Sequence, residues 1–558
     1  MLASRIYALG ILGFTLAWLV NDHYRPWTNF HSEALAFIGI WLLALSQLVN
    51  RRFSNASAPR LMVVVASMIL IPWAQFFLGI SFFAGDALIS SLYLCGFLAA
   101  IFVGYTLSRS DAANLNCGFI WVMHGLWLAA MVSAAIGLLQ WLNLQAYLSI
   151  YVVQTDFGDP AMANLAQPNQ LATLLLLGII ACGYIFERRI IGGFTFSLSI
   201  FVMTAVLVLT HSRAGMLGVL AVGGFLFVKR SRMNARLRAG HIVAWLLFFV
   251  LATVASPSID QALMLNVERE PLFTSGGRML IWSQITQGII QSPWLGYGWN
   301  QTAAAQMVGV VLYPGALPVS YAHSIILDMI VWNGVPLGLV LIGLGAYWFC
   351  TRIYRVAGLD AGYAMACLLP ITVHSLVEFP FAYSYFLITA GLMMGVVEAY
   401  EIPVKVWRIH RFWLGAALAF WAIIGSYMIY EYFLIEEDFR VVRFELLRVG
   451  KTEATYQVPD IWMLSHMGTM LKAARQPAVP NMTAQQLNDL RQVSLRFPLN
   501  PVNLRYALAL GLNGDPDGAR HMMAVVRGMY GEKYYAAAKA LWAENAVKYP
   551  QLRAINVP

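Results

Sequence analysis

Charged residues are scarce in this chain of 558 residues: Asp, Glu, Lys and Arg make up only 11% of it, against roughly 25% in soluble domains. Hydrophobic residues make up 59%, and the mean hydropathy is +0.66. This balance excludes a soluble globular protein and indicates an integral membrane protein. The net charge is +9, but the basic residues lie mostly in short loops between apolar runs, so we expect no nucleic-acid partner.

Cysteine is also rare, and no pair of cysteines lies in an exported loop, so we expect neither a structural disulfide nor a thiolate metal site. The sequence has no GxxxxGK[ST] phosphate loop, no HExxH, and no DxD-type carboxylate pair in the large polar loop. We therefore expect no ATP site, no metal and no cofactor. No cleavable signal peptide is evident, and we expect the first apolar run to be a retained span. The five cysteines are Cys95, Cys117, Cys182, Cys350 and Cys367.

Thirteen apolar runs approach the roughly 20 residues that a helix needs to cross a bilayer. We therefore expect an all-α polytopic membrane protein with about 12–13 transmembrane helices. The runs lie at 5–20, 33–49, 61–80, 86–107, 118–141, 168–186, 190–210, 213–228, 241–256, 322–350, 361–377, 381–400 and 411–434.

The distribution of basic residues predicts the orientation. With the N-terminus in the cytoplasm, the cytoplasmic connections carry seventeen Lys and Arg residues and the outer connections carry four. We predict four parts, of which the last is an outer helical domain similar to TPR arrays. Helix starts at Asn500-Pro501 and Asp515-Pro516 support that domain. The parts are an N-terminal transmembrane bundle (1–256), a large outer loop (257–321), a second bundle (322–435) and the outer domain (436–558).

Polar residues gather at or near the outer ends of these spans. Ionisable groups at membrane depth are costly and usually mark a substrate path or a reaction site. Their shared location predicts a site that faces outward and is supplied from the membrane. The residues are Gln167, Asn169, Gln170, His211, Arg213, Arg278, His323, His374 and Glu378.

His323 lies in the segment YAHSIILDMIVWNGVPLG (321–338), directly after the large loop. A histidine there can accept a proton near neutral pH. Asn333-Gly334 and Pro336 should interrupt the helix that follows. The plainer alternative is a helix-end histidine that hydrogen-bonds to loop backbone.

Arg213 lies in THSRAG, and Arg278 lies in GGRMLIW. Arginine is always charged, and its planar fork suits phosphate. The alternatives are a snorkelling interfacial residue for Arg213 and a solvated loop charge for Arg278.

AQPNQ places Gln167, Asn169 and Gln170 at a helix start, where amides could bind sugar hydroxyls or a carbonyl. Simple helix capping is the alternative, although capping needs only one such residue.

HSLVEFPFAYSYF places His374, Glu378, Tyr383 and Tyr385 around an outer turn. His374 and Glu378 are four residues apart, so we expect them on one helix face. An ion pair between helices and tyrosines of the aromatic belt form the alternative.

Together these segments resemble the bacterial O-oligosaccharyltransferases of the PglL type, within the O-antigen ligase and polymerase superfamily. HYRPW (23–27), NLAQPNQLATLL (164–175) and GYGWNQ (296–301) join the motifs quoted above in the order that the family has. One departure is Ser324, since the family often has Asn after the histidine. The outer C-terminal domain resembles that of the protein-glycosylating branch.

The resemblance implies a location in the bacterial inner membrane, so that the outer loop (257–321) and the outer domain (436–558) are periplasmic. It also implies a glycan donor on undecaprenyl pyrophosphate. It implies as acceptor a serine or threonine hydroxyl of an exported protein such as a pilin. His323 matches the family's proposed base, and Arg213 and Arg278 match arginines proposed to hold the pyrophosphate. Either Gln167 or Gln170, and either Tyr383 or Tyr385, matches a further implicated residue. Arginines could take the place of a metal ion at the leaving pyrophosphate.

Two alternatives stay open. The chain could be an O-antigen ligase that acts on lipid A-core, or a polymerase that extends lipid-linked repeats. It could instead be a flippase or transporter of lipid-linked sugar, since broken helices and intramembrane charge suit transporters too. A transporter should place polar residues near the bilayer midplane and show an inverted repeat, and the sequence shows neither.

Overall fold

The computed structural model describes residues 1–50, 55–109, 118–265, 267, 277–401, 406–453 and 455–557. Five residues named or counted in the sequence analysis lie outside these ranges: Arg51, Arg52, Cys117, Arg269 and Lys405. The chain divides into two compact units, each of which takes segments from several of the four predicted parts. Unit 1 comprises residues 1–67, 93–274 and 347–423, and unit 2 comprises residues 68–92, 275–346 and 424–558.

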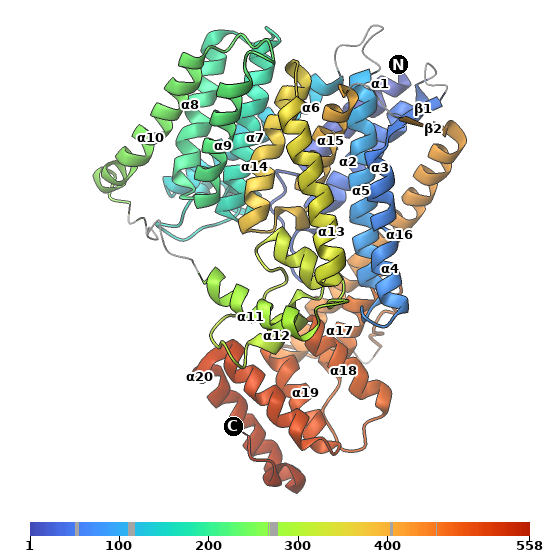
Figure 1. The fold of residues 1–558 in the computed structure, drawn as a ribbon. Coiled ribbons are helices and arrows are strands. Elements are labelled where there is room, and N and C mark those ends of the chain that lie inside the picture. The colour runs from blue at the N-terminus through green and yellow to red at the C-terminus, as the bar shows by residue number, and fades with distance from the viewer. Residues whose placement is uncertain are drawn as a thin grey trace. The chain divides into compact units, whose positions relative to one another are not determined.

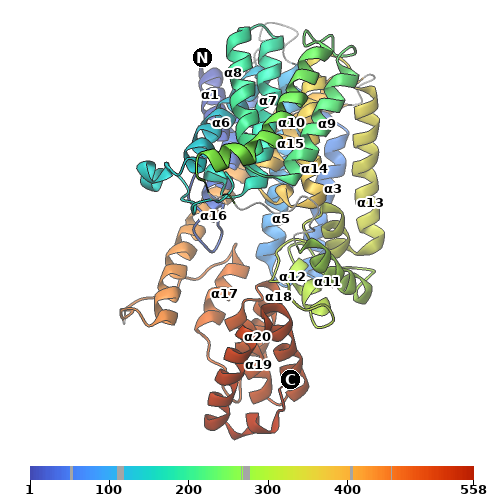
Figure 2. The same ribbon diagram turned by 90° about the vertical axis from the view of Figure 1, so that its left-hand side faces the viewer.

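Unit 1 is a bundle of helices around one large apolar core. The central helix is α7, which is buried around almost its whole circumference, whereas α10 is largely exposed. Helices α7, α8, α9 and α14 run side by side (Figure 1; Figure 2). The helices of unit 1 are α1 (Leu2–Leu16), α2 (Phe30–Val49), α3 (Leu61–Met68), α6 (Gly118–Trp141), α7 (Pro168–Glu187), α8 (Gly193–Leu209), α9 (Arg213–Lys229), α10 (Ala239–Ala262), α14 (Leu359–Val377) and α15 (Ser384–Ala399), with 3₁₀ turns at Gln145–Tyr151, Ala163–Leu165 and Pro380–Ala382.

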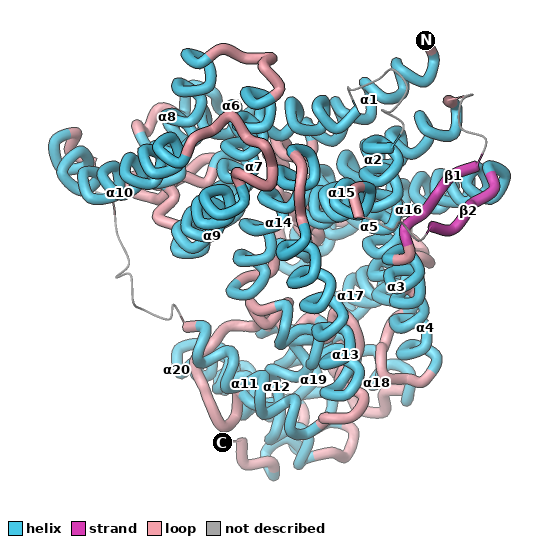
Figure 3. The backbone as a smooth tube through the Cα atoms, turned by 45° about the horizontal axis from the view of Figure 1, so that its top comes forward, coloured by secondary structure: helices cyan, strands magenta, loops and turns pink. Residues whose placement is uncertain are grey.

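A two-stranded antiparallel ribbon in unit 1 is the described departure from an all-helical fold (Figure 3). Strand β1 (Asn55–Pro59) pairs with β2 (Val406–His410), with Asn55 opposite His410 and Pro59 opposite Val406. The sequence predicts loops at both segments, because two five-residue strands are too short to give a periodic signal.

Three long helices, α5 (Ala84–Arg109), α13 (Ile325–Arg355) and α16 (Arg411–Leu447), contribute residues to both units. Unit 2 also contains α4 (Leu70–Phe77), α11 (Arg278–Gln291), α12 (Thr302–Gly309), α17 (Ser465–Arg475), α18 (Ala484–Arg496), α19 (Asn500–Leu512), α20 (Pro516–Lys548) and a 3₁₀ turn at Pro550–Ala554. The large polar loop of the sequence analysis therefore contains two helices, α11 and α12.

The prediction of an all-α polytopic membrane protein is confirmed. Every one of the thirteen predicted spans coincides with a helix. By length and composition, eight helices among the described residues can cross a membrane, and α1, the α3–α4 segment, α8 and α15 are shorter apolar helices. The eight are α2, α5, α6, α7, α10, α13, α14 and α16.

The predicted interruption of α13 is a kink at Gly334, where φ is 73° and ψ is 169°. The kink removes the helical partners of nearby carbonyl groups, and the loop GYGWN replaces them. The Tyr297 N–H donates to the Val331 carbonyl at 2.8 Å, and the Gly298 N–H donates to the Trp332 carbonyl at 3.1 Å. Gln75 adds a third donor, from its Nε2 to the Trp332 carbonyl at 2.7 Å. The GYGWN loop and the kinked segment of α13 therefore contact each other within unit 2.

The C-terminal helices have a core of their own, in which α19 packs along α20 (Figure 1; Figure 2). The helix starts at Asn500 and at Asp515-Pro516 are confirmed, and the Asp515 side chain caps α20 by accepting from the Gly518 N–H at 2.8 Å. Thr483 and Gln486 form a capping box at the start of α18. Met307 and Val310, from the large loop, complete this core.

The C-terminal helices are tied to α5 within unit 2 by a buried ion pair. Arg496 donates to Asp86 from Nε at 3.0 Å and from a terminal nitrogen at 2.9 Å. His466 lies buried beside this pair and stacks on Phe497, with ring centroids 6.2 Å apart. Burial lowers the pKa of His466 from 6.5 to about 4, so the imidazole is neutral at physiological pH.

We predict that Gly334→Ala destabilises unit 2 by about 3 kcal/mol or more, because the φ of 73° is strained for alanine. A Cβ at this position would also overlap the carbonyl group of Trp294. The thermal unfolding midpoint of the purified protein in detergent measures the effect. Gly343→Ala in the same helix meets nothing within 4 Å and should leave the midpoint unchanged or raise it slightly. Equal midpoints for both variants would contradict the assigned kink.

We predict that part of the acid sensitivity of the protein comes from His466. Because its pKa is lowered by folding, the unfolded chain binds more protons between pH 6.5 and 4, and stability falls with pH through that range. Acidification from pH 7.5 to 5 should cost about 2 kcal/mol through this group. His466→Phe, which keeps the stacking, should lose that part of the pH dependence of the unfolding midpoint. A variant with the pH dependence of the wild type would contradict the assignment.

Candidate active site

The predicted site residues form two clusters, one in each unit. Arg278 and His323 belong to unit 2. The others belong to unit 1, where all lie at the ends of helices: Gln167, Asn169, Gln170, His211, Arg213, His374, Glu378, Tyr383 and Tyr385.

Gln167 and Gln170 form one chain of hydrogen bonds at the start of α7. Gln170 is buried, and its Nε2 donates to Gln167 Oε1 at 2.7 Å. Its Oε1 accepts from the Tyr385 hydroxyl at 2.7 Å. Gln167 occupies the N-cap position, but its side chain makes no cap hydrogen bond. Helix capping, the plainer alternative for Gln167, therefore does not describe its side chain.

Asn169 joins three segments of unit 1. Its Oδ1 accepts from the Ser212 hydroxyl at 2.6 Å, and its Nδ2 donates to Glu378 Oε1 at 3.3 Å. Ser212 is also the N-cap of α9, where its Oγ accepts from the Gly215 N–H at 2.9 Å. Arg213 is the first residue of α9, so this network fixes the backbone from which its side chain extends.

The close packing of α9 against α7 explains why the THSRAG motif has a glycine, Gly215. A Cβ at this position would lie 2.8 Å from the Cβ of Ala172, so only glycine lets α9 approach α7 this closely. His211, with φ of 49°, lies in the turn between the end of α8 and the start of α9. This turn lies beside the start of α7, where Ser212 bonds Asn169.

His374 and Glu378 do not share a helix face, so that prediction is wrong. Helix α14 ends at Val377, and Glu378 is extended, with φ of −151° and ψ of −166°. His374 Nδ1 lies 2.9 Å from the Thr173 hydroxyl, which also lies 3.0 Å from the Asn169 carbonyl. Both His374 and Glu378 therefore contact α7, through different residues, and both are buried.

Tyr385 is buried, whereas Tyr383 is partly exposed. Their rings stack with centroids 5.7 Å apart, and Tyr385 also contacts Trp18 at 4.8 Å. The hydroxyl of Tyr385 donates to Gln170, and the partly exposed ring of Tyr383 stacks on the ring of Tyr385.

Glu33, which the sequence analysis missed, lies buried in α2 of the same unit. It accepts from Trp27 Nε1 at 3.1 Å and from the Tyr93 hydroxyl, while its backbone carbonyl accepts from Ser384 at 3.3 Å. Trp27 belongs to the HYRPW motif. A single acid in an apolar run is the signal that could have identified Glu33.

The opposite ends of the same helices carry ion pairs. Arg188, after α7, pairs with Asp360 at the start of α14. Arg352 pairs with Glu398 at 2.7 Å and with Glu401 at 3.0 Å. Within unit 1, the amides, histidines and tyrosines of the candidate site are therefore separated from these ion pairs by the length of α7.

His323 lies in the turn before α13, two residues before the helix begins, and has a left-handed backbone with φ of 54°. The preceding residue, Ala322, is held at both of its backbone groups. Its N–H donates to the two carboxylate oxygens of Asp328 at 2.9 and 3.0 Å, and its carbonyl accepts from Trp282 Nε1 at 2.9 Å. Asp328 is fully buried.

Arg278 is the first residue of α11, after Gly277. Trp282 lies four residues later, so Arg278 and Trp282 share a face of the helix. Since Trp282 bonds Ala322, this face is turned toward the segment that carries His323. The same face of α11 therefore carries Arg278 and the tryptophan that bonds the residue before His323.

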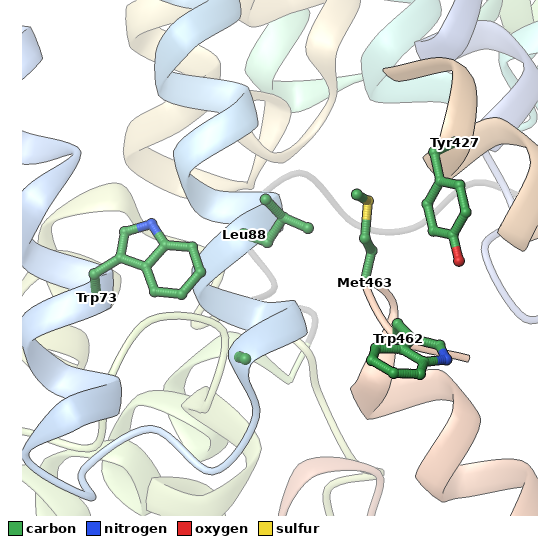
Figure 4. Close-up of a pocket in the computed structure, with 6 residues that line it drawn as sticks. Trp73, Leu88, Tyr427, Trp462 and Met463 are labelled. Carbon is green, nitrogen blue, oxygen red and sulfur yellow. The ribbon is translucent and has the colours of Figure 1, made fainter. Parts of the chain in front are cut away.

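Unit 2 also holds an apolar pocket of about 440 Å³ (Figure 4). None of the predicted site residues lines it. Within the described ranges, no three His, Cys, Asp or Glu side chains converge in a way that could hold a metal ion. The four described cysteines are free thiols. The pocket is lined by Trp73, Ala84, Leu88, Tyr427, Trp462 and Met463.

Three segments match models of known protein families. Residues 198–342 match the O-antigen ligase family, and residues 161–186 match the protein glycosylation ligase family. Residues 362–544 match the C-terminal part of a virulence factor, the membrane-bound polymerase. The three matches contain every predicted site residue.

Two relatives come from Acinetobacter baylyi (strain ATCC 33305 / BD413 / ADP1). The chain is 27% identical to a general O-oligosaccharyltransferase over 550 residues, which cover 93% of this chain and 91% of the relative. It is 24% identical to a ComP-specific O-oligosaccharyltransferase over 402 residues, which cover 70% and 71%. These matches confirm the resemblance to the PglL-type O-oligosaccharyltransferase and O-antigen ligase family. They support a multi-pass membrane protein that is a glycosyltransferase.

We predict that Ser212→Ala destabilises unit 1 by about 1–2 kcal/mol, because it removes the cap of α9 and the donor to Asn169. The unfolding midpoint in detergent should fall by about 1–3 °C. Ser212→Thr keeps the hydroxyl and should stay near the wild type. Ser67→Ala removes a hydroxyl that bonds only a backbone carbonyl of its own helix and serves as the control. A wild-type midpoint for Ser212→Ala would count against the network.

Proposed function

We propose that this protein transfers a preassembled oligosaccharide en bloc from undecaprenyl pyrophosphate to serine or threonine hydroxyls of exported proteins, pilins among them. The observation that carries the proposal is the match to the general O-oligosaccharyltransferase, which runs through the C-terminal helices as well as the membrane region. The clusters described above supply the side chains that such a transfer needs.

The reaction is an inverting displacement. The acceptor hydroxyl gives its proton to the His323 imidazole, and its oxygen forms a bond to the anomeric carbon of the glycan. The bond between that carbon and the phosphate oxygen breaks, and undecaprenyl pyrophosphate leaves with the electron pair. Arg213 and Arg278 bind the departing pyrophosphate, so the reaction needs no metal ion or other cofactor. A general base of this kind contributes about 10²–10⁴-fold to the rate.

The hydrogen bonds in unit 1 suggest different roles for the two glutamines. Gln170 and Tyr385 are buried and bonded to each other, which suits a positioning role. Gln167 and Tyr383 are more exposed, so we propose that these two contact the substrate. The starts of α7 and α9 and the end of α14 are held together by hydrogen bonds of Asn169, His374 and Glu378.

We propose that both clusters and the C-terminal helices face the periplasm from the inner membrane, with the N-terminus in the cytoplasm. The bias of basic residues supports this orientation. The ion-paired arginines at the far end of the unit 1 helices agree with it.

A second candidate acceptor is lipid A-core, or the end of another lipid-linked repeat. The matches to the O-antigen ligase and polymerase families favour it. The chemistry of donor and leaving group would be the same, so only the identity of the hydroxyl distinguishes the two.

We predict that the purified protein in detergent, given undecaprenyl-pyrophosphate glycan and a candidate acceptor protein in the presence of EDTA, adds the glycan mass to serine or threonine. His323→Ala should lower the rate at least about 100-fold, because the hydroxyl loses its base. His521→Ala removes an exposed histidine of α20 and should react at the wild-type rate. Mass spectrometry of the acceptor measures all three.

Full activity of well-folded His323→Ala would contradict the mechanism. Absence of transfer to protein by well-folded wild type would contradict the proposed acceptor and favour lipid A-core. Transfer in detergent, where no bilayer has to be crossed, would exclude transport as the sole activity.

A further inference from the structure

We infer that Asp328 is the positioning residue of the reaction: it locks the turn that carries His323. This inference rests on the proposed function, in which His323 is the base. Asp328 lies in the first turn of α13 and is fully buried in unit 2.

Asp328 holds the chain on both sides of His323. Before the histidine, the Ala322 N–H donates to both carboxylate oxygens, at 2.9 and 3.0 Å. After it, the backbone N–H of Asp328 donates to the Ser324 carbonyl at 2.9 Å. The two residues that flank His323 are thus fixed by one residue, through its side chain and its backbone.

A second layer of hydrogen bonds fixes the carboxylate itself. The Thr302 hydroxyl donates to Asp328 Oδ1 at 2.8 Å, and Trp332 Nε1 donates to that same hydroxyl oxygen at 2.8 Å. The proton of Thr302 therefore goes to Asp328, and the direction of each bond in the chain is determined. Such a chain keeps both carboxylate oxygens turned toward Ala322.

The turn needs this support because His323 has a left-handed backbone, with φ of 54°, which residues other than glycine seldom adopt. Without the carboxylate, the segment can relax toward ordinary backbone angles, and the imidazole moves with it. A displacement of about 1 Å at a reacting group can lower a rate about 100-fold. Asp328 therefore acts through the placement of His323.

Asp328→Asn tests the inference. An amide keeps the shape but sets an NH₂ group against the Ala322 N–H, so one acceptor is lost and two donors face each other. In the detergent assay we expect kcat to fall about 10–100-fold, while KM for donor and acceptor stays within about twofold of the wild type. Glu431→Gln is the matched control, because Glu431 is a buried carboxylate of unit 2 that accepts the backbone N–H groups of Trp462, Met463 and Leu464. It should keep the wild-type kcat.

A double-mutant cycle separates positioning from general destabilisation. If Asp328 acts through His323, then Asp328→Asn should cost nothing further in the His323→Ala background. Losses that multiply in the double variant, or a kcat for Asp328→Asn within twofold of the wild type, would overturn the inference. Should Asp328→Asn not fold, Thr302→Val decides the question, with Thr302→Ser as its conservative partner. We expect Thr302→Val to lower kcat and Thr302→Ser to stay near the wild type, and equal kcat for the two would overturn the inference.

The activity of His323→Ala distinguishes a failure of the inference about Asp328 from a failure of the proposed function. An inactive His323→Ala beside a fully active Asp328→Asn would leave the proposed function intact and remove only the positioning role. A fully active His323→Ala would remove the base, and the inference with it.

Discussion

Polar groups at membrane depth have no water to bind, so each break in an apolar helix has to be closed by another part of the protein. The kink of α13 shows how this constraint shapes unit 2. The kink at Gly334 frees the Val331 carbonyl, and Pro336, which has no N–H, leaves the Trp332 carbonyl without a helical donor. The backbone N–H groups of Tyr297 and Gly298 bond these two carbonyl groups. A loop of glycines and aromatic residues is thereby fixed to a transmembrane helix, a few residues from the turn that carries His323. The same constraint acts in unit 1, where the starts of α7 and α9 are joined through Asn169 and Ser212.

Each unit holds its own set of polar side chains. Unit 2 supplies a histidine on a locked turn and an arginine at a helix start. Unit 1 supplies an arginine, a pair of amides and two tyrosines, with the deeper amide and the deeper tyrosine bonded to each other. Guanidinium groups suit a pyrophosphate leaving group because they stay charged at every physiological pH and can bind two oxygens at once. In the proposed reaction, the buried carboxylates Glu33 and Asp328 hold other groups in place.

Much of this could be predicted from the sequence, because apolar runs of membrane length are a strong signal. All thirteen runs are helices, and the glycine and proline after Trp332 marked the kink correctly. The polar residues at the ends of α7, α9 and α14 were found as outliers in apolar surroundings. The prediction for Glu378 failed because the sequence does not show where α14 ends: helical spacing placed it beside His374, but the helix stops one residue earlier. The short strands β1 and β2 were missed since five residues give no usable period. The locking role of Asp328 depends on hydrogen bonds to Ala322 and Thr302, which no spacing along the chain reveals.

The identity of the acceptor is the central claim, and a strain that lacks this chain tests it most directly. Mass spectrometry of its exported proteins, beside a profile of its lipopolysaccharide, distinguishes the two acceptors in one measurement. We expect glycan masses to disappear from serine and threonine residues while the lipopolysaccharide profile stays unchanged, and we expect the wild-type chain to restore them. Unchanged glycoproteins beside a lipopolysaccharide without O-antigen would contradict it.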